Sequence, residues 1–175
     1  LLGLQKSGMA RAIRKAHESR KAVYGICGGF QMMGNWINDP EHVEGNVSRI
    51  PGLGILPVET TLTTEKVTEQ CSFIFQQNNL PGRGYEIHMG ETVAEDKSPL
   101  CLVDGGKEDG WFLSPKTWGT YIHGIFDNIE IVNAVLAASG GKASSKLDFR
   151  QFKEEQYDKL AALVRANVDL EYIYK

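Results

Sequence analysis

The sequence has no long apolar run, and this absence excludes a large class of proteins. No stretch approaches the ~18 consecutive apolar residues that suggest a membrane-spanning helix. The chain begins Leu-Leu-Gly-Leu, with no basic segment leading into a long apolar one, so we expect no secretory signal peptide. Because an initiator Met is also missing, we expect the chain to be a fragment of a longer protein.

Cysteine and clustered positive charge are scarce as well. The three cysteines, Cys27, Cys71 and Cys101, are an odd number without regular spacing, which argues against a disulfide framework and favours a reducing, cytoplasmic setting. No Cys-x-x-Cys pair or His-x-x-x-His spacing predicts a zinc site, so we expect no metal. The net charge is -3, and no stretch clusters Lys and Arg with aromatic residues. We therefore do not expect a nucleic-acid-binding surface.

What the sequence does contain is the composition of an ordinary globular protein. Hydrophobic residues make up 42% and charged residues 23%, which excludes intrinsic disorder as the main state. The 175 residues are enough for one sizeable core. We therefore expect a single domain over residues 1–175.

The apolar pattern predicts an α/β fold. The run 22–26 is apolar without alternation, which suits a parallel strand covered on both faces. The order of elements predicts a mixed sheet with helices on both sides. We expect helices over 7–20, 30–36, 128–138 and 148–168, a loop over 38–52, and strands over 22–26, 53–64, 73–75, 84–92, 99–103 and 118–122.

The strongest local signal is the turn around Cys27, Gly-Ile-Cys-Gly-Gly-Phe-Gln at 25–31, between a predicted strand and a predicted helix. A nucleophile on such a strained turn needs small neighbours, and the glycines at 25, 28 and 29 supply the room. The helix N-terminus stabilises a thiolate, and the Gly28 N–H is the first candidate to stabilise an oxyanion. We interpret Cys27 as a nucleophile; the alternative is a small buried thiol.

A thiol nucleophile is helped by a base that is distant in sequence and close in space. Of the four histidines, His17 and His42 have the surroundings of surface residues. His123 follows a predicted strand, and ligands bind at the carboxyl ends of strands in open α/β sheets. His123 is therefore the leading candidate base, and His88 is the second.

Three segments together resemble a known family. They are the cysteine turn, Gly-Tyr-Glu-Ile-His-Met-Gly at 84–90 and Gly-Thr-Tyr-Ile-His-Gly-Ile-Phe-Asp-Asn at 119–128. With them, nearly the whole chain resembles the glutamine amidotransferase domain of cobyric acid synthase, in the triad-type (class I) superfamily. The resemblance implies a flavodoxin-like three-layer sandwich, with a mixed, mostly parallel central sheet and helices on both sides.

The resemblance also implies a reaction. Cys27 would attack the side-chain amide of glutamine and form a γ-glutamyl thioester, and His123 would move the proton to departing ammonia. Gln31 matches the position that helps hold glutamine, and Gly28 and Tyr121 complete the expected substrate-binding set. The ammonia would pass to an N-terminal synthetase domain of the same protein. There, ATP with Mg²⁺ would drive amidation of adenosylcobyrinic acid a,c-diamide, a corrinoid, in cobalamin biosynthesis. No cofactor is expected in this domain.

Two features depart from a complete triad enzyme. Many carry His-x-Glu, whereas Ile125 stands two positions after His123. Cobyric acid synthases resemble this sequence in lacking that Glu. Glu86 is our candidate for orienting His123; the alternatives are a solvated carboxylate or a substrate contact. The second departure is the Gly-rich loop that supplies a second oxyanion donor, which has no counterpart in this sequence. A phosphate-binding loop is also absent from it. One lost donor costs on the order of 100–1,000-fold in rate, so we expect weak activity from the chain alone.

Other hypotheses remain open. A related amidotransferase could act on the a,c carboxylates of cobyrinic acid or on a cell-wall lipid precursor. A non-catalytic interaction domain could keep the fold, although the intact Cys27 and His123 argue against it. A cysteine hydrolase or peptidase could use the same scaffold, but Gln31 in the substrate-holding position disfavours it.

Overall fold

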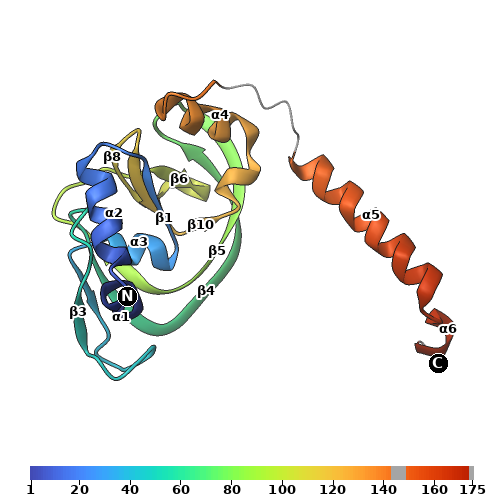
Figure 1. Ribbon diagram of the computed structural model, residues 1–175, viewed down its shortest axis with the longest axis horizontal. Helices are drawn as coiled ribbons and strands as arrows, with labels where there is room; N and C mark the ends of the chain where they lie inside the picture. The colour runs from blue at the N-terminus through green and yellow to red at the C-terminus, as the bar shows by residue number, and fades with distance from the viewer. Residues whose placement is uncertain (143–148, 174–175) are drawn as a thin grey trace.

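The structure, a computed structural model, describes residues 1–142 and 149–173 (Figure 1). Its α-helices are α1 (Leu2–Lys6), α2 (Met9–Glu18), α3 (Gly28–Met33), α4 (Ile129–Ala138), α5 (Phe149–Asn167) and α6 (Leu170–Ile173), with 3-10 turns η1 (Asp104–Gly106) and η2 (Ile125–Asp127). Its strands are β1 (Val23–Ile26), β2 (Trp36–Asn38), β3 (Arg49–Pro51), β4 (Glu59–Phe75), β5 (Leu80–Val93), β6 (Cys101–Val103), β7 (Lys107–Asp109), β8 (Trp111–Ser114), β9 (Thr117–Thr120) and β10 (Ile122–His123).

The strands form two mixed sheets. The smaller has the order β1-β9-β8, and the larger has the order β10-β5-β4-β2-β3, with β6 and β7 attached through β4. Within the described ranges, β1 with β9 and β2 with β4 are the two parallel pairs, and the other six pairs are antiparallel. The predicted α/β class with a mixed sheet is confirmed. The mostly parallel sheet is not observed, because antiparallel hairpins supply most of the pairing.

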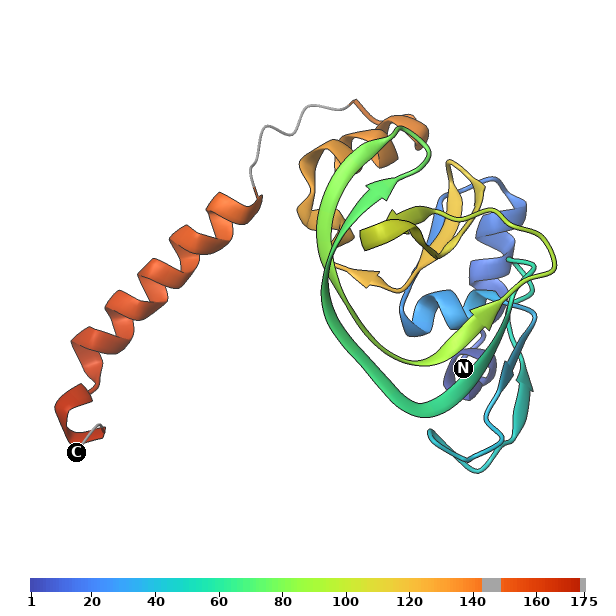
Figure 2. The ribbon, with the colours of Figure 1, turned by 180° about the vertical axis from the view of Figure 1, so that it is seen from behind.

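The largest departure from the predicted elements is the β4–β5 hairpin. Its two strands have 17 and 14 residues and curve around the rest of the fold as a long ribbon (Figures 1 and 2). The strands predicted over 53–64 and 73–75 both overlap β4, which runs on through the exposed polar stretch between them. A bulge between Thr61 and Lys66 interrupts the register, and bulges of this kind bend a strand. The predicted loop over 38–52 also contains a short strand, β3.

Two apolar clusters stabilise the structure around the smaller sheet. One contains Phe30 and Met33 of α3 with Trp111 of β8. The other contains Trp118 of β9 with Phe75 of β4. Full burial of such a Phe or Met side chain contributes roughly 1.5–3 kcal/mol relative to leaving it exposed. The small sheet is thus covered on both faces, as its apolar sequence predicts.

The parallel pair of β1 and β9 positions the region of interest. The register runs from Val23 opposite Thr117 to Ile26 opposite Thr120. Gly119 is needed here, because a Cβ at this position would overlap the ring of Phe30 on α3. The predicted parallel strand is confirmed, and its carboxyl end delivers residue 27 beside the segment that follows Thr120.

The C-terminal helix α5 stands apart from the sheets (Figures 1 and 2). It confirms the helix predicted over 148–168 for residues 149–167; residue 148 lies outside the described residues, and Val168 follows the helix end. Apolar side chains on this helix are exposed, with Phe152, Leu160 and Leu163 at 41%, 56% and 61%. None of the helices in the described ranges has both the length and the apolar character needed to span a membrane.

Candidate functional site

Cys27 occupies the strained turn that the sequence predicts. It connects β1 to α3 with φ 53° and ψ -117°, a backbone conformation that costs a non-glycine residue about 1–3 kcal/mol. Its N–H donates a hydrogen bond to the Thr120 carbonyl at 2.8 Å, which fixes the turn to β9. A Cβ at Gly25 would lie 2.6 Å from Met33 Sδ, whereas one at Gly28 or Gly29 would meet nothing within 4 Å. Of the three glycines expected to make room, only Gly25 is sterically required.

The surroundings of Cys27 favour the thiol over the thiolate. Its Sγ donates a hydrogen bond to the Ile87 carbonyl at 3.3 Å. Burial raises the pKa of the Cys27 thiol above its usual 9.0; the Gly28 N–H opposes this shift and the charge of Glu44 adds to it. The helix end therefore favours the thiolate as expected, but burial outweighs it. A base must take the proton before the sulfur can attack.

His123 lies at the same edge of the fold as Cys27. It ends β10, three residues after the Thr120 carbonyl that holds the cysteine turn. In the antiparallel pair of β10 and β5, His123 stands opposite Tyr85, and the two rings stack with centroids 5.1 Å apart and planes 9° apart. His123 Nε2 is buried and has no hydrogen-bond partner among the described residues. Cys27 and His123 thus both contact strand β5, at Ile87 and Tyr85, and the described residues show no hydrogen bond between the two side chains.

Strand β5 separates two environments, because successive side chains point to opposite faces. Tyr85 and Ile87 are 38% and 39% exposed on the side of His123, whereas Glu86 is 2% exposed. The Glu86 carboxylate accepts a hydrogen bond from Lys107 Nζ at 3.0 Å and lies 3.9 Å from His88 Nε2. The register places Glu86 opposite Ile122. Glu86 therefore does not contact His123 in this structure, which corrects its expected place beside the base.

His88, the second candidate base, shares the inner face of β5 with Glu86. Its ring stacks on Tyr121 with centroids 3.8 Å apart, and Nδ1 lies 3.2 Å from the Gly90 carbonyl. Burial lowers the pKa of His88. Its Nδ1–H donates to the Gly90 carbonyl, and its buried Nε2 lies 3.9 Å from the Glu86 carboxylate. This placement favours His123 as the base for Cys27.

The substrate-binding candidates Gln31 and Tyr121 bond to each other. Gln31 Nε2 donates to the Met89 carbonyl at 3.1 Å and to the Tyr121 hydroxyl at 3.2 Å. The Tyr121 hydroxyl lies 2.6 Å from Thr92 Oγ1, which lies 2.7 Å from Thr60 Oγ1. No sequence signal indicated the two threonines, because a β-branched residue in a strand pattern indicates only the strand.

A buried carboxylate with no sequence signal for a functional role, that of Asp109, supports the strand before His123. Asp109 accepts hydrogen bonds from the Thr120 hydroxyl and, at 3.2 Å, from the Tyr121 N–H. Burial raises the pKa of Asp109 to about 6. In the sequence, an Asp-Gly pair such as that at 109–110 is typical of a turn, and Gly110 does adopt φ 74°.

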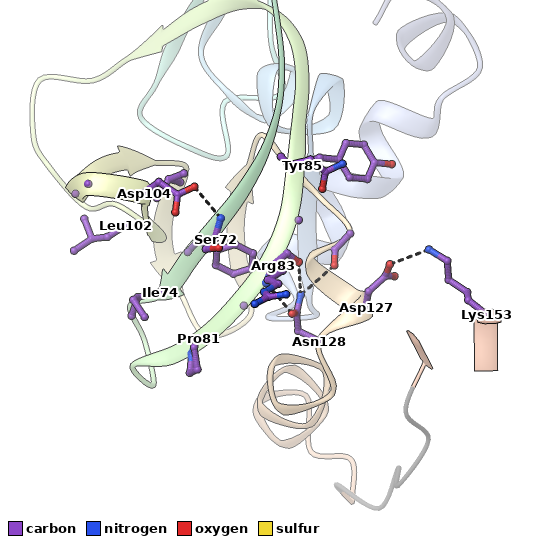
Figure 3. Close-up of a pocket in the computed structure, with 18 of the residues that line it drawn as sticks. Ser72, Ile74, Pro81, Arg83, Tyr85, Leu102, Asp104, Asp127, Asn128 and Lys153 are labelled. Atoms are coloured by element: carbon purple, nitrogen blue, oxygen red, sulfur yellow. Dashed lines mark hydrogen bonds and ion pairs between the residues drawn. The ribbon is translucent and has the colours of Figure 1, made fainter. Parts of the chain in front are cut away.

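Asn128 ties the two ends of this region together (Figure 3). Its Oδ1 accepts from the Arg83 N–H at 3.0 Å, and its Nδ2 donates to the Arg83 carbonyl at 3.0 Å. The same amide donates to the carbonyls of Gly124 and Ile125, at 3.1 and 3.0 Å. One side chain thus fixes the beginning of β5 to the turn that follows His123.

Three cavities surround the site. One of about 410 Å³ is lined by Gly28, Gln31 and Glu44 beside the cysteine turn. A second of about 510 Å³ contains Glu86 on the inner face of β5. The largest, about 1100 Å³, is an open groove where Tyr85 lies near Arg83 and Asn128 (Figure 3). In the described part of the chain, no group of three His, Cys, Asp or Glu side chains could hold a metal ion.

Comparison with known proteins identifies the family of this chain. Residues 1–131 match the CobB/CobQ-like glutamine amidotransferase domain. The chain is 47% identical over 179 residues to a protein named cobyric acid synthase from Bacteroides fragilis, covering 100% of this chain and 36% of that protein. It is 46% identical over 180 residues to the protein of the same name from Parabacteroides distasonis, covering 99% and 36%.

The chain thus spans about a third of the length of these curated relatives. A solved structure, that of SMU.1228c, aligns with 90% of this chain and 70% of its own at a TM-score of 0.44 and 15% identity. The family match covers most of the chain and includes both Cys27 and His123. The chain belongs to the CobB/CobQ-like glutamine amidotransferase domain family.

Proposed function

We propose that this chain is the glutaminase part of a cobyric acid synthase. It would release ammonia from glutamine for the amidation of peripheral carboxylates of adenosylcobyrinic acid a,c-diamide, in cobalamin biosynthesis. The observation that carries the proposal is Cys27 on a strained turn, φ 53°, whose N–H is bonded to the Thr120 carbonyl three residues before His123. The identity of 46–47% to proteins named cobyric acid synthase supports the choice of acceptor.

The reaction follows from the groups at the turn. His123 takes the proton of the Cys27 thiol, and the sulfur attacks the side-chain amide carbon of glutamine. The Gly28 N–H, at the free end of α3, stabilises the oxyanion that forms. His123 returns the proton to the leaving nitrogen, so that ammonia departs and a γ-glutamyl thioester remains. Water then cleaves the thioester to give glutamate and the free thiol.

The cavity beside the cysteine turn is the proposed glutamine site. Its volume of about 410 Å³ accommodates a single amino acid, and Gly28 and Gln31 line it. Glu44 adds a carboxylate to the same wall, which suits the α-ammonium group of the substrate. Tyr121 contributes through Gln31, whose amide it holds.

The acceptor chemistry lies outside this chain in the proposal. The relatives continue well beyond the matched region, and ATP, Mg²⁺ and the corrinoid would bind to that remaining part of the protein. We also propose that the domain is flavodoxin-like. We propose a cytoplasmic location for the protein. An alternative within the same family is an amidotransferase for cobyrinic acid or a cell-wall lipid precursor.

Covalent labelling of the full-length protein tests the proposal. A glutamine-mimicking electrophile should modify Cys27, and the adduct is located by mass spectrometry of peptides. Cys27→Ala should abolish labelling, His123→Ala should slow it, and Cys71→Ala, which removes a buried thiol elsewhere, should leave it intact. Absence of an adduct on the folded wild-type protein would refute the glutaminase assignment.

A second assay separates the acceptors. With ATP, Mg²⁺ and glutamine, the full-length protein should amidate adenosylcobyrinic acid a,c-diamide. Amidation of cobyrinic acid instead, with no activity on the diamide, would favour the alternative.

A further inference from the structure

We propose that Tyr85 is the positioning residue of the base: its ring holds the imidazole of His123 in place, where other triad enzymes use a carboxylate. The inference rests on the proposed function, because it assumes that His123 moves protons for Cys27. It gives a role to a residue of β5 that the sequence did not single out, and it supplies the orienting group that Glu86 does not provide.

The contact between the two rings is direct. Tyr85 and His123 form a cross-strand pair of β5 and β10, the arrangement in which antiparallel side chains interact most closely. Their ring planes lie 9° apart with centroids 5.1 Å apart. The terminal torsion of a histidine is broad and has no sharp preference of its own. A parallel ring against one face removes much of that freedom.

No polar side chain takes this role in the described part of the chain. His123 Nε2 is buried and has no hydrogen-bond partner. Glu86 lies on the opposite face of β5, where Lys107 binds it at 3.0 Å. Ile125, at the position where many triad enzymes carry Glu, is fully buried and apolar. The stacked ring of Tyr85 is therefore the side-chain contact that the structure offers the imidazole.

The surrounding backbone holds Tyr85 against His123. A Cβ at Gly84 would overlap the His123 carbonyl oxygen, so the close approach of β5 and β10 depends on this glycine. One residue earlier, the N–H and carbonyl of Arg83 are both bonded to Asn128, which also holds the turn after His123 (Figure 3). The two rings thus sit on segments that are fixed to each other.

The stack also suits the charge that develops during the reaction. When His123 takes the thiol proton it becomes an imidazolium cation, and a cation within about 6 Å of an aromatic ring face is attracted to it. The Tyr85 hydroxyl makes no hydrogen bond in the described structure, so the ring and not the hydroxyl carries the effect. Phenylalanine at position 85 should therefore support activity as well as tyrosine does.

The test compares Tyr85→Leu with Tyr85→Phe in the full-length protein. Steady-state glutamine hydrolysis gives kcat and KM, and the rate of Cys27 labelling by the glutamine-mimicking electrophile isolates the first chemical step. We expect Tyr85→Leu to lower kcat and the labelling rate by about 10- to 100-fold, the effect of a misplaced catalytic group, with KM unchanged. Tyr85→Phe should restore both rates. Tyr172→Leu makes the same exchange on α6, at a tyrosine 81% exposed, and should behave as wild type.

Each outcome either supports or overturns the role of Tyr85. Wild-type kcat in Tyr85→Leu overturns the inference, and so does a loss in Tyr85→Phe as large as that in Tyr85→Leu. Circular dichroism monitors folding, and Tyr85→Met, which fills the space without a ring, replaces Tyr85→Leu if the latter misfolds. If the wild-type protein neither hydrolyses glutamine nor labels at Cys27, the proposed function fails and the inference falls with it. An active wild type with an equally active Tyr85→Leu removes the inference alone.

Discussion

The Cys27 thiol donates a hydrogen bond to the carbonyl oxygen of Ile87, with 3.3 Å between Sγ and O. Two residues earlier on the same strand, the ring of Tyr85 stacks on His123. A single strand, β5, therefore contacts both the nucleophile and the candidate base, through its backbone at one point and through a side chain at the other.

The protonation state of Cys27 leads to a first prediction. Burial raises the pKa of this thiol above 9.0, and only the thiolate alkylates rapidly. In the absence of substrate, alkylation by iodoacetamide should therefore be slow at pH 7 and should still be rising at pH 9. Mass-spectrometric quantification of the Cys27 peptide against pH checks this. A rate that reaches its plateau below pH 8 would contradict it.

The close packing of α3 on β1 leads to a second prediction. A Cβ at Gly25 would lie 2.6 Å from Met33 Sδ and 2.8 Å from the backbone nitrogen of Phe30. Gly25→Ala should lower the free energy of unfolding by about 1–3 kcal/mol, because the backbone cannot move aside cheaply. Urea denaturation measures the change.

Gly29→Ala is the matched control for that exchange. Its Cβ would meet nothing within 4 Å, and alanine in a helix is about 1 kcal/mol more favourable than glycine. Gly29→Ala should therefore be neutral or slightly stabilising. Equal losses in the two variants would show that the turn requires flexibility and not space.

Asp109 leads to a third prediction, on pH dependence. Burial raises the pKa of its carboxyl from 3.8 to about 6, so the folded state binds the proton more tightly than the unfolded state. The resulting stability is fully present below pH 4 and is lost as pH rises through about 6, in total on the order of 3 kcal/mol. In Asp109→Asn this contribution should vanish, and the difference in Tm between mutant and wild type should change over pH 4–6. A difference that is constant across this range would count against the shifted pKa.

Asn128 leads to a fourth prediction. Its amide joins Arg83 to Gly124 and Ile125 through four hydrogen bonds. Asn128→Ala should cost about 1–3 kcal/mol of stability, because backbone groups lose their partners. It should also lower kcat for glutamine hydrolysis more than it changes KM, since the turn after His123 is released. Denaturation and steady-state kinetics on the same preparation separate the two effects, and a change in KM alone would argue against this role.

The features that the sequence predicted correctly are local ones. The strand, turn and helix around Cys27 follow from an apolar run and from glycines within seven residues, and the structure confirms them. The helix at 129–138 is also visible in a short window of sequence, and so is the part of the strand predicted over 118–122 that forms β9; the rest belongs to β10, in the other sheet. In each case the determining contacts lie within one or two elements.

The features that it missed depend on pairing between distant segments. Glu86 was a reasonable candidate by its position, but whether it or Tyr85 faces His123 depends on the register of β5 with β10, which composition does not encode. The sequence did not predict β4 as a single long strand, because the polar middle of β4 is stabilised by pairing with β5 and not by an apolar pattern of its own. Asp109 is buried and Thr92 is half-buried, and their hydrogen-bond partners lie 11 and 29–32 residues away in the chain.

The alternation of faces along β5 has a consequence for how this protein tolerates insertions and deletions. Loss of one residue from the strand just before Tyr85, with pairing otherwise kept, would exchange the two faces. The carboxylate of Glu86 would then take the position opposite His123, and Ile87 would take the interior position that Glu86 leaves. Loss of two residues would shorten the strand but preserve which face each remaining side chain occupies. Within this segment, an even change in length should therefore be less harmful than an odd one.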